Sequence, residues 1–117
     1  MDFNSAIAAH SAWKSKLRRY LSQPDHSLNA ATVSQSSGCD LGKWMANEGR
    51  AYTTNATFSE LKKEHEKFHQ MAGDLIRRAD SGQQVNGEVE LSSHSPYMQC
   101  TTHVIQLLAK LRDQHLH

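Results

Sequence analysis

Two histidines, His65 and His69, lie four positions apart in the middle of the chain. On an α-helix this spacing places both imidazoles on one face, close enough to bind the same metal ion. His10 falls on the apolar stripe of a predicted N-terminal helix and can supply a third nitrogen from across the core. One such histidine alone is more often a hydrogen-bonded core residue. Three on facing stripes favour a metal site.

Cys39 is the candidate fourth ligand. A free cysteine is often only a small buried apolar residue, but Cys39 falls at the predicted N-terminus of a helix, where the helix dipole favours the metal-binding thiolate. Three imidazoles and one thiolate form a closed tetrahedral set that suits zinc. This mixture argues against magnesium and calcium, but it does not exclude copper or nickel. We therefore predict one zinc ion per chain, bound by His10, Cys39, His65 and His69.

Residues 65–69 read His-Glu-Lys-Phe-His, which also matches the H-E-x-x-H pattern of zinc peptidases. In those enzymes the glutamate is the general base, and one zinc position stays open for water. Cys39 would occupy the position that hydrolysis needs, and an H-x-x-G-x-x-H continuation does not follow in the sequence. We interpret Glu66 as a solvated helix residue and expect no catalytic residues. A metallopeptidase is the third hypothesis.

The segments that carry these residues have helical periodicity. Apolar residues recur every three to four positions in residues 2–21 and again in the segment that contains His65 and His69, which predicts two long helices. The second of these is predicted to begin with a capping box at residues 57–60 and to end at Gly82. A third long helix is predicted to follow Ser95 and Pro96.

A shorter helix is predicted over residues 39–48, with Gly49 as its C-terminal cap. The Ser/Asn/Asp-rich residues 23–37 before it are predicted to be a connection with a weak turn at 28–33. Three long helices and one short helix that carries Cys39 predict an all-α fold, specifically an antiparallel four-helix bundle. The 117 residues are expected to form a single zinc-binding domain over residues 1–117.

The overall charge and hydropathy exclude several classes of partner. The formal net charge is +1, from 13 basic and 12 acidic residues that are spread along the chain, so we expect no nucleic-acid or membrane partner. No apolar run approaches the roughly 20 residues that span a bilayer, and no signal peptide is evident. We therefore expect a soluble, cytoplasmic protein. The cysteines Cys39 and Cys100 are too few for a disulfide framework.

The last predicted helix is apolar on more than one face, and we expect a monomer to leave part of that surface exposed. This predicts a two-fold homodimer. Cys100 lies on the same helix without metal-ligand candidates nearby in sequence. The remaining histidines are expected to be solvated, with an adventitious surface site conceivable at the last two; they are His26, His94, His103, His115 and His117.

Taken together, the ligand candidates and their neighbours resemble one known family. The compound motif is His10-x2-Trp13, Cys39-x-Leu41-Gly42-x-Trp44 and His65-x3-His69. It is similar to that of the chemoreceptor zinc-binding domain (CZB). The resemblance covers nearly the whole chain, including the Ser-Pro-Tyr opening of the last helix, and no candidate ligand position departs from the family pattern.

The resemblance implies a regulatory function. Domains of this family are found at the end of soluble bacterial chemoreceptors or beside diguanylate cyclase modules, where they dimerise and respond to zinc or to oxidants such as hypochlorous acid. We therefore expect a non-enzymatic sensory domain of chemotaxis or cyclic-di-GMP signalling, which responds to zinc availability or to oxidation of Cys39. The alternative is a structural module in which zinc only stabilises a dimer.

Overall fold

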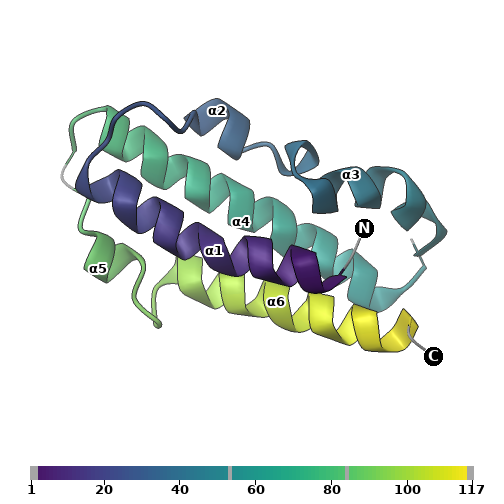
Figure 1. The fold of residues 1–117 in the computed structure, drawn as a ribbon. Helices are drawn as coiled ribbons and strands as arrows, with labels where there is room; N and C mark the ends of the chain where they lie inside the picture. The colour runs from purple at the N-terminus through teal and green to yellow at the C-terminus, as the bar shows by residue number, and fades with distance from the viewer. Residues whose placement is uncertain (1–2, 53, 84, 116–117) are drawn as a thin grey trace.

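The computed structural model describes residues 3–52, 54–83 and 85–115. Within these ranges the chain forms six α-helices and two 3-10 helices, and no β-strand (Figure 1). The predicted all-α class is confirmed. In chain order the elements are α1 (Phe3–Ser22), α2 (Ala30–Val33), η1 (Ser36–Gly38), α3 (Asp40–Ala46), η2 (Glu48–Tyr52), α4 (Ala56–Asp80), α5 (Gly87–Glu90) and α6 (Pro96–His115).

The three longest helices of the described residues, α1, α4 and α6, lie side by side (Figure 1). Helices α1 and α4 run in the same direction and α6 runs in the opposite one. The segment that joins α1 to α4 returns along the bundle as α2, η1 and α3. The predicted short helix that follows Cys39 is therefore one of four short helical elements that the described residues form between α1 and α4, namely α2, η1, α3 and η2. The finer description as an antiparallel four-helix bundle stays a prediction.

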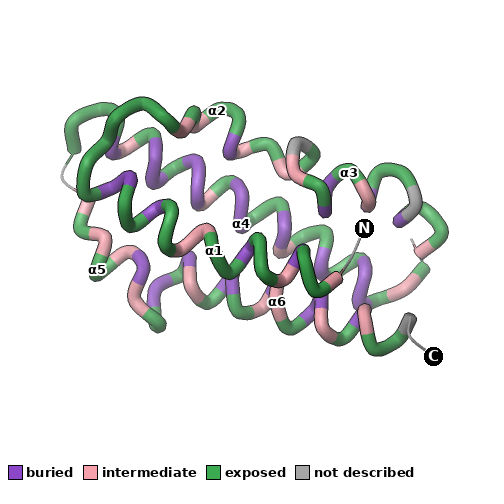
Figure 2. The backbone as a smooth tube through the Cα atoms, viewed as in Figure 1, coloured by how far each residue is buried: buried purple, intermediate pink, exposed green. Residues whose placement is uncertain are grey.

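The core lies where the apolar stripes of the long helices meet. Figure 2 shows buried positions along the inward faces of α1, α4 and α6. Leu17 from α1, Phe68 and Ile76 from α4, and Leu108 from α6 are completely buried. None of the helices in the described part of the chain combines the length and apolar character that crossing a bilayer requires.

Two predicted helix ends are wrong. The N-cap of helix α4 lies two residues earlier than the predicted box, because the Asn55 side chain accepts hydrogen bonds from the backbone N–H groups of Thr57 (2.8 Å) and Phe58 (3.2 Å). Asparagine caps a helix at least as well as threonine, so Thr57 is left inside the helix. Helix α3 ends at Ala46, and Gly49 lies within η2 and is not its cap.

The start of α6 is as predicted. Pro96 is its first residue, and the Ser95 hydroxyl accepts a hydrogen bond from the Met98 N–H (3.2 Å). The apolar faces of α6 are mostly covered within the single chain, which buries Val104, Leu107, Leu108 and Leu111 and leaves Ile105 half-buried. The homodimer prediction thus has little exposed apolar area to support it and depends mainly on the family resemblance.

Candidate metal centre

The structure brings His10, Cys39, His65 and His69 together at one point in the core. One ligand atom from each of the four lies within 4.8 Å of those of the others. His10 comes from α1 and the His65–His69 pair from α4, whereas Cys39 is the N-cap residue of α3. Residues separated by as many as 59 positions in the sequence therefore share one small volume.

The closest approaches are centred on His65. Its Nε2 atom lies 3.0 Å from Nε2 of His69 and 3.1 Å from the Cys39 sulfur. Ligand nitrogens at about 2.0–2.1 Å from a tetrahedral zinc ion are separated by about 3.3 Å. The spacing in this cluster is thus close to that of a coordination shell.

Two backbone carbonyls orient the outer histidines. Nδ1 of His10 lies 2.7 Å from the Ala6 carbonyl oxygen, and Nδ1 of His69 lies 2.8 Å from the Val33 carbonyl oxygen. Because a carbonyl can only accept, each Nδ1 must carry the proton and donate it. Nε2 of each ring then keeps its lone pair, which is the arrangement by which metal-bound histidines are oriented.

Gly73 allows the Val33 carbonyl to reach His69. A Cβ atom at position 73 would lie 1.9 Å from the Ser34 hydroxyl oxygen and 3.0 Å from the Ala30 carbonyl oxygen. Only glycine therefore lets α2 pack this closely against α4. Sequence reasoning missed both Gly73 and Val33; the small pair Ala72-Gly73 within an apolar stripe was the available sign of a close helix approach.

Cys39 is held by a similarly tight turn. Its sulfur accepts a hydrogen bond from the Gly42 N–H at 3.5 Å, as expected for a side chain at an N-cap. A Cβ atom at Gly42 would lie 1.9 Å from the Ser36 carbonyl oxygen, so a larger residue would push η1 away from α3. Gly42 thus lets the chain turn sharply enough to direct Cys39 at the histidines.

Burial determines the protonation of the four groups. It lowers the pKa of His10 and His69, and it lowers that of His65 to about 3, with a further decrease from the neighbouring His69 and His10. All three imidazoles are therefore neutral acceptors at pH 7. Burial also raises the pKa of the Cys39 thiol, which the Gly42 and Leu41 N–H groups only partly oppose. The helix N-terminus alone does not produce a thiolate, so a cation is needed to stabilise it.

The donor set fits zinc. It consists of neutral imidazole nitrogens and one sulfur, contains no carboxylate, and is the one cluster of this kind within the described ranges. Such donors suit zinc and not the oxygen-binding ions magnesium and calcium. The peptidase hypothesis has no comparable support, because Glu66 is exposed and the Cys39 sulfur takes the place where a zinc-bound water would be needed.

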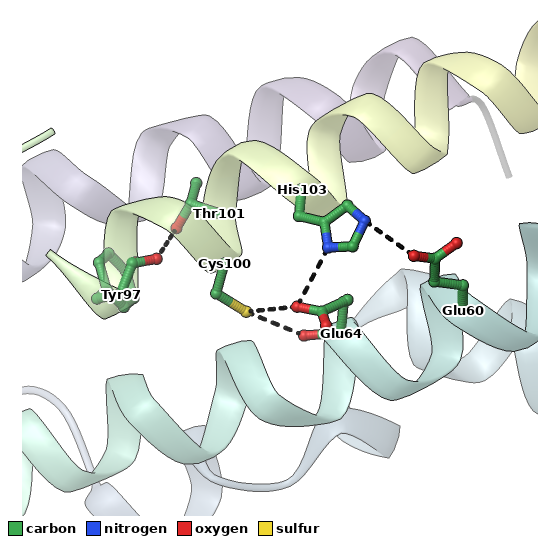
Figure 3. A network of polar contacts seen from close by, with 6 residues as sticks. All are labelled: Glu60, Glu64, Tyr97, Cys100, Thr101 and His103. Carbon is green, nitrogen blue, oxygen red and sulfur yellow. Dashed lines mark hydrogen bonds and ion pairs between the residues drawn. The ribbon is translucent and has the colours of Figure 1, made fainter. Parts of the chain in front are cut away.

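A second polar cluster, between α4 and α6, was not anticipated (Figure 3). His103 was expected to be solvated, but it is half-buried and lies between two carboxylates, with Nε2 3.1 Å from Glu60 and Nδ1 3.6 Å from Glu64. The Cys100 sulfur lies 3.3 Å from the Glu64 carbonyl oxygen. We call these four residues the α4–α6 cluster.

The other histidines lie away from both clusters. His26 and His94 are exposed, as predicted. The expected solvation of His115 and His117 concerns side chains outside the described part of the structure.

Residues 10–76 match the sequence model of the family described as chemoreceptor zinc-binding domain. The matched range includes all four residues of the candidate metal centre. No curated protein and no solved structure matches the chain.

Proposed function

Because the chain belongs to the chemoreceptor zinc-binding domain family, we propose that it is a zinc-binding sensory module of bacterial signal transduction, with His10, Cys39, His65 and His69 as the ligands. One observation carries the proposal. Three neutral imidazoles and a thiol from three separate segments converge within 4.8 Å in the core. Such a group can bind a cation through the sulfur and one nitrogen of each ring, in place of the hydrogen-bond contacts of 3.0–3.1 Å that His65 makes with His69 and Cys39.

The proposed signal is a change at the ligand that α3 provides. His65 and His69 lie on a 25-residue helix, whereas Cys39 precedes a helix of only seven residues. Loss of the Cys39–metal contact would therefore free α3 more than α4. Either low zinc or oxidation would break this contact. With hypochlorous acid the thiolate sulfur gains the oxygen to become a sulfenic acid, while the chlorine leaves as chloride.

The output is proposed to pass to a module joined to α1 or α6. The beginning of α1, the end of α6 and α3 all lie at the same end of the molecule (Figure 1). A displacement of α3 would thus occur beside the points where such a module would be attached. From the family resemblance we propose that this module is a chemoreceptor signalling domain or a diguanylate cyclase module. On the same ground we propose a homodimeric assembly and a cytoplasmic location.

Metal analysis of the purified protein tests the ligand assignment. We expect about one zinc ion per chain, and loss or strong weakening of binding in Cys39→Ala and in His69→Ala, because either change opens a four-ligand shell. Cys100→Ala is the matched control, since Cys100 lies in the α4–α6 cluster, and it should retain zinc. Full zinc content in both ligand variants would refute the assignment.

A structural, dimer-stabilising zinc is the second candidate function. It is favoured by the same fact that the ligands join three segments, because such a metal cross-links them. The two functions differ in reversibility. A sensor is supported if zinc leaves and returns at moderate chelator or oxidant levels and if residues 39–48 lose hydrogen-exchange protection when it leaves. Zinc that is released only on unfolding supports the structural function.

A further inference from the structure

A cleft of about 680 Å³ lies between α1 and α3 beside the candidate metal centre. His10 and Cys39 both line it, and its remaining walls include Ala6, Ala9 and Trp44. The volume is within the range of roughly 300–1,000 Å³ in which proteins hold small molecules. Because the exposed residues Ala9 and Lys43 also line it, the cleft connects solvent to one edge of the four-residue group.

The four candidate ligands are not equally protected. His10, His65 and His69 are only 3%, 1% and 3% exposed, whereas Cys39 is half-buried. A second cavity, of about 150 Å³, touches His65 but not Cys39. The thiol is thus the donor that a small molecule arriving from the larger cleft would meet first.

The walls of the cleft suit compact molecules without a strong charge preference. Alanine side chains at positions 6 and 9 of α1 leave the cleft wide on that side. Asp40 and Lys43 contribute one charge of each sign on the α3 side, so neither anions nor cations are excluded.

We propose that this cleft is the entry path by which compact metal-chelating molecules reach the centre and exchange its zinc. Cys39 is then the first ligand to be replaced: a donor atom of the chelator takes its place and the sulfur takes up a proton from water. His65 and His69 would be released last, because neither of them lines the cleft. The inference rests on the proposed function, and it predicts that the width of the cleft controls the rate of exchange and not the affinity.

Two adjacent residues of α1 provide a matched test. Ala8 and Ala9 are both exposed, but only Ala9 lines the cleft. We expect Ala9→Phe to slow zinc transfer to the chelator 4-(2-pyridylazo)resorcinol about tenfold, the effect of raising a barrier by about 1.4 kcal/mol. Ala8→Phe should transfer zinc at the wild-type rate. Both variants should bind one zinc ion at equilibrium.

A measurement on the zinc-free protein separates this inference from the metal assignment. In a Cys100→Ala background, iodoacetamide can modify only Cys39, and Ala9→Phe but not Ala8→Phe should slow that reaction. Circular dichroism checks that the variants fold, and Ala9→Leu is a smaller alternative. If zinc transfer and alkylation each proceed at the same rate in all variants, the cleft is not the entry path, and α3 must detach to admit the reagents. A wild-type chain without zinc but with slowed alkylation in Ala9→Phe would instead refute the proposed function alone.

Discussion

The candidate metal centre and the α4–α6 cluster both place a cysteine close to a histidine, yet they differ in every other respect. In the metal centre, Cys39 lies 3.1 Å from the imidazole of His65, and no carboxylate is part of the group. In the α4–α6 cluster, His103 lies between two carboxylates, and Cys100 contacts the backbone and side chain of Glu64 at 3.3 and 3.5 Å. The first joins neutral imidazoles to a thiol, and the second joins a thiol and a histidine to carboxylates.

The surroundings of these residues, and not their type, therefore decide their chemistry. Burial and, after it, the Glu64 carboxylate raise the pKa of Cys100 to about 12, so its sulfur keeps a proton that it can donate. Burial also raises the pKa of Cys39, but backbone N–H groups, first that of Gly42, oppose the effect, and its sulfur contacts the neutral imidazole of His65. A cation can replace the thiol proton of Cys39, whereas the carboxylate beside Cys100 favours the protonated thiol.

Zinc removal should reveal the largest contrast between the two regions. If zinc at a thousandfold excess over its dissociation constant binds only the folded chain, it stabilises the fold by about 4 kcal/mol. We therefore expect a chelator to lower the melting temperature of the wild-type chain clearly, and to have no effect on Cys39→Ala. Because the apolar stripes pack without the metal, circular dichroism of the zinc-free protein should still show mostly helix. A fully unfolded zinc-free chain would contradict this.

Acidification should destabilise the zinc-free protein through the metal centre. Its three histidines have lowered pKa values in the folded state, with His65 at about 3, whereas they titrate near 6.5 when unfolded. The unfolded chain thus binds more protons below pH 6.5, and stability falls as the pH decreases from there towards 3. The slope reaches about 1.4 kcal/mol per pH unit for each histidine. Urea unfolding at pH 7, 6, 5 and 4 measures it.

The matched variant for this pH dependence is His65→Gln, which should flatten the zinc-free profile because it removes the histidine with the lowest pKa. A profile that stays the same in His65→Gln would show that other groups dominate the acid response.

Gly73→Ala should affect the metal centre through its support. The added methyl group would overlap with Ser34, so α2 must move and the His69–Val33 hydrogen bond is lost or lengthened. Overpacking of this kind costs about 1–3 kcal/mol, and zinc affinity should fall as well because His69 is no longer oriented. Gly87→Ala is the control, since a Cβ there has no neighbour closer than 4.0 Å. Equal zinc affinity in both variants would count against the orienting role.

The smallest effect is expected from His103→Gln in the α4–α6 cluster. His103 and Glu60 are 38% and 54% exposed in their side chains, and ion pairs at such sites contribute about 0–1 kcal/mol. Zinc content should be unchanged. A loss of zinc on this substitution would mean that the two clusters are coupled through α4, and the contrast drawn between them would fail.

Much of the candidate centre was predictable because it depends on local periodicity. The i, i+4 spacing of His65 and His69 places both on one helix face wherever that helix packs, and His10 shares a stripe with Leu17 and Leu21. The opening of α6 is equally local, since Ser95 and Pro96 suit the N-cap and first helical positions by their own geometry.

What only the tertiary structure decided involves contacts between segments. Three of these contacts join residues more than 30 positions apart. They are the hydrogen bond from His69 to the Val33 carbonyl, the close approach of α2 at Gly73, and the contacts of His103 with the two carboxylates beside it. The choice between Asn55 and Thr57 as the cap of α4 was also open, because both residue types favour the N-cap position. Periodicity specifies which face of a helix turns inward. The partner it meets there depends on how closely the backbones approach, and that distance is determined only when the segments pack.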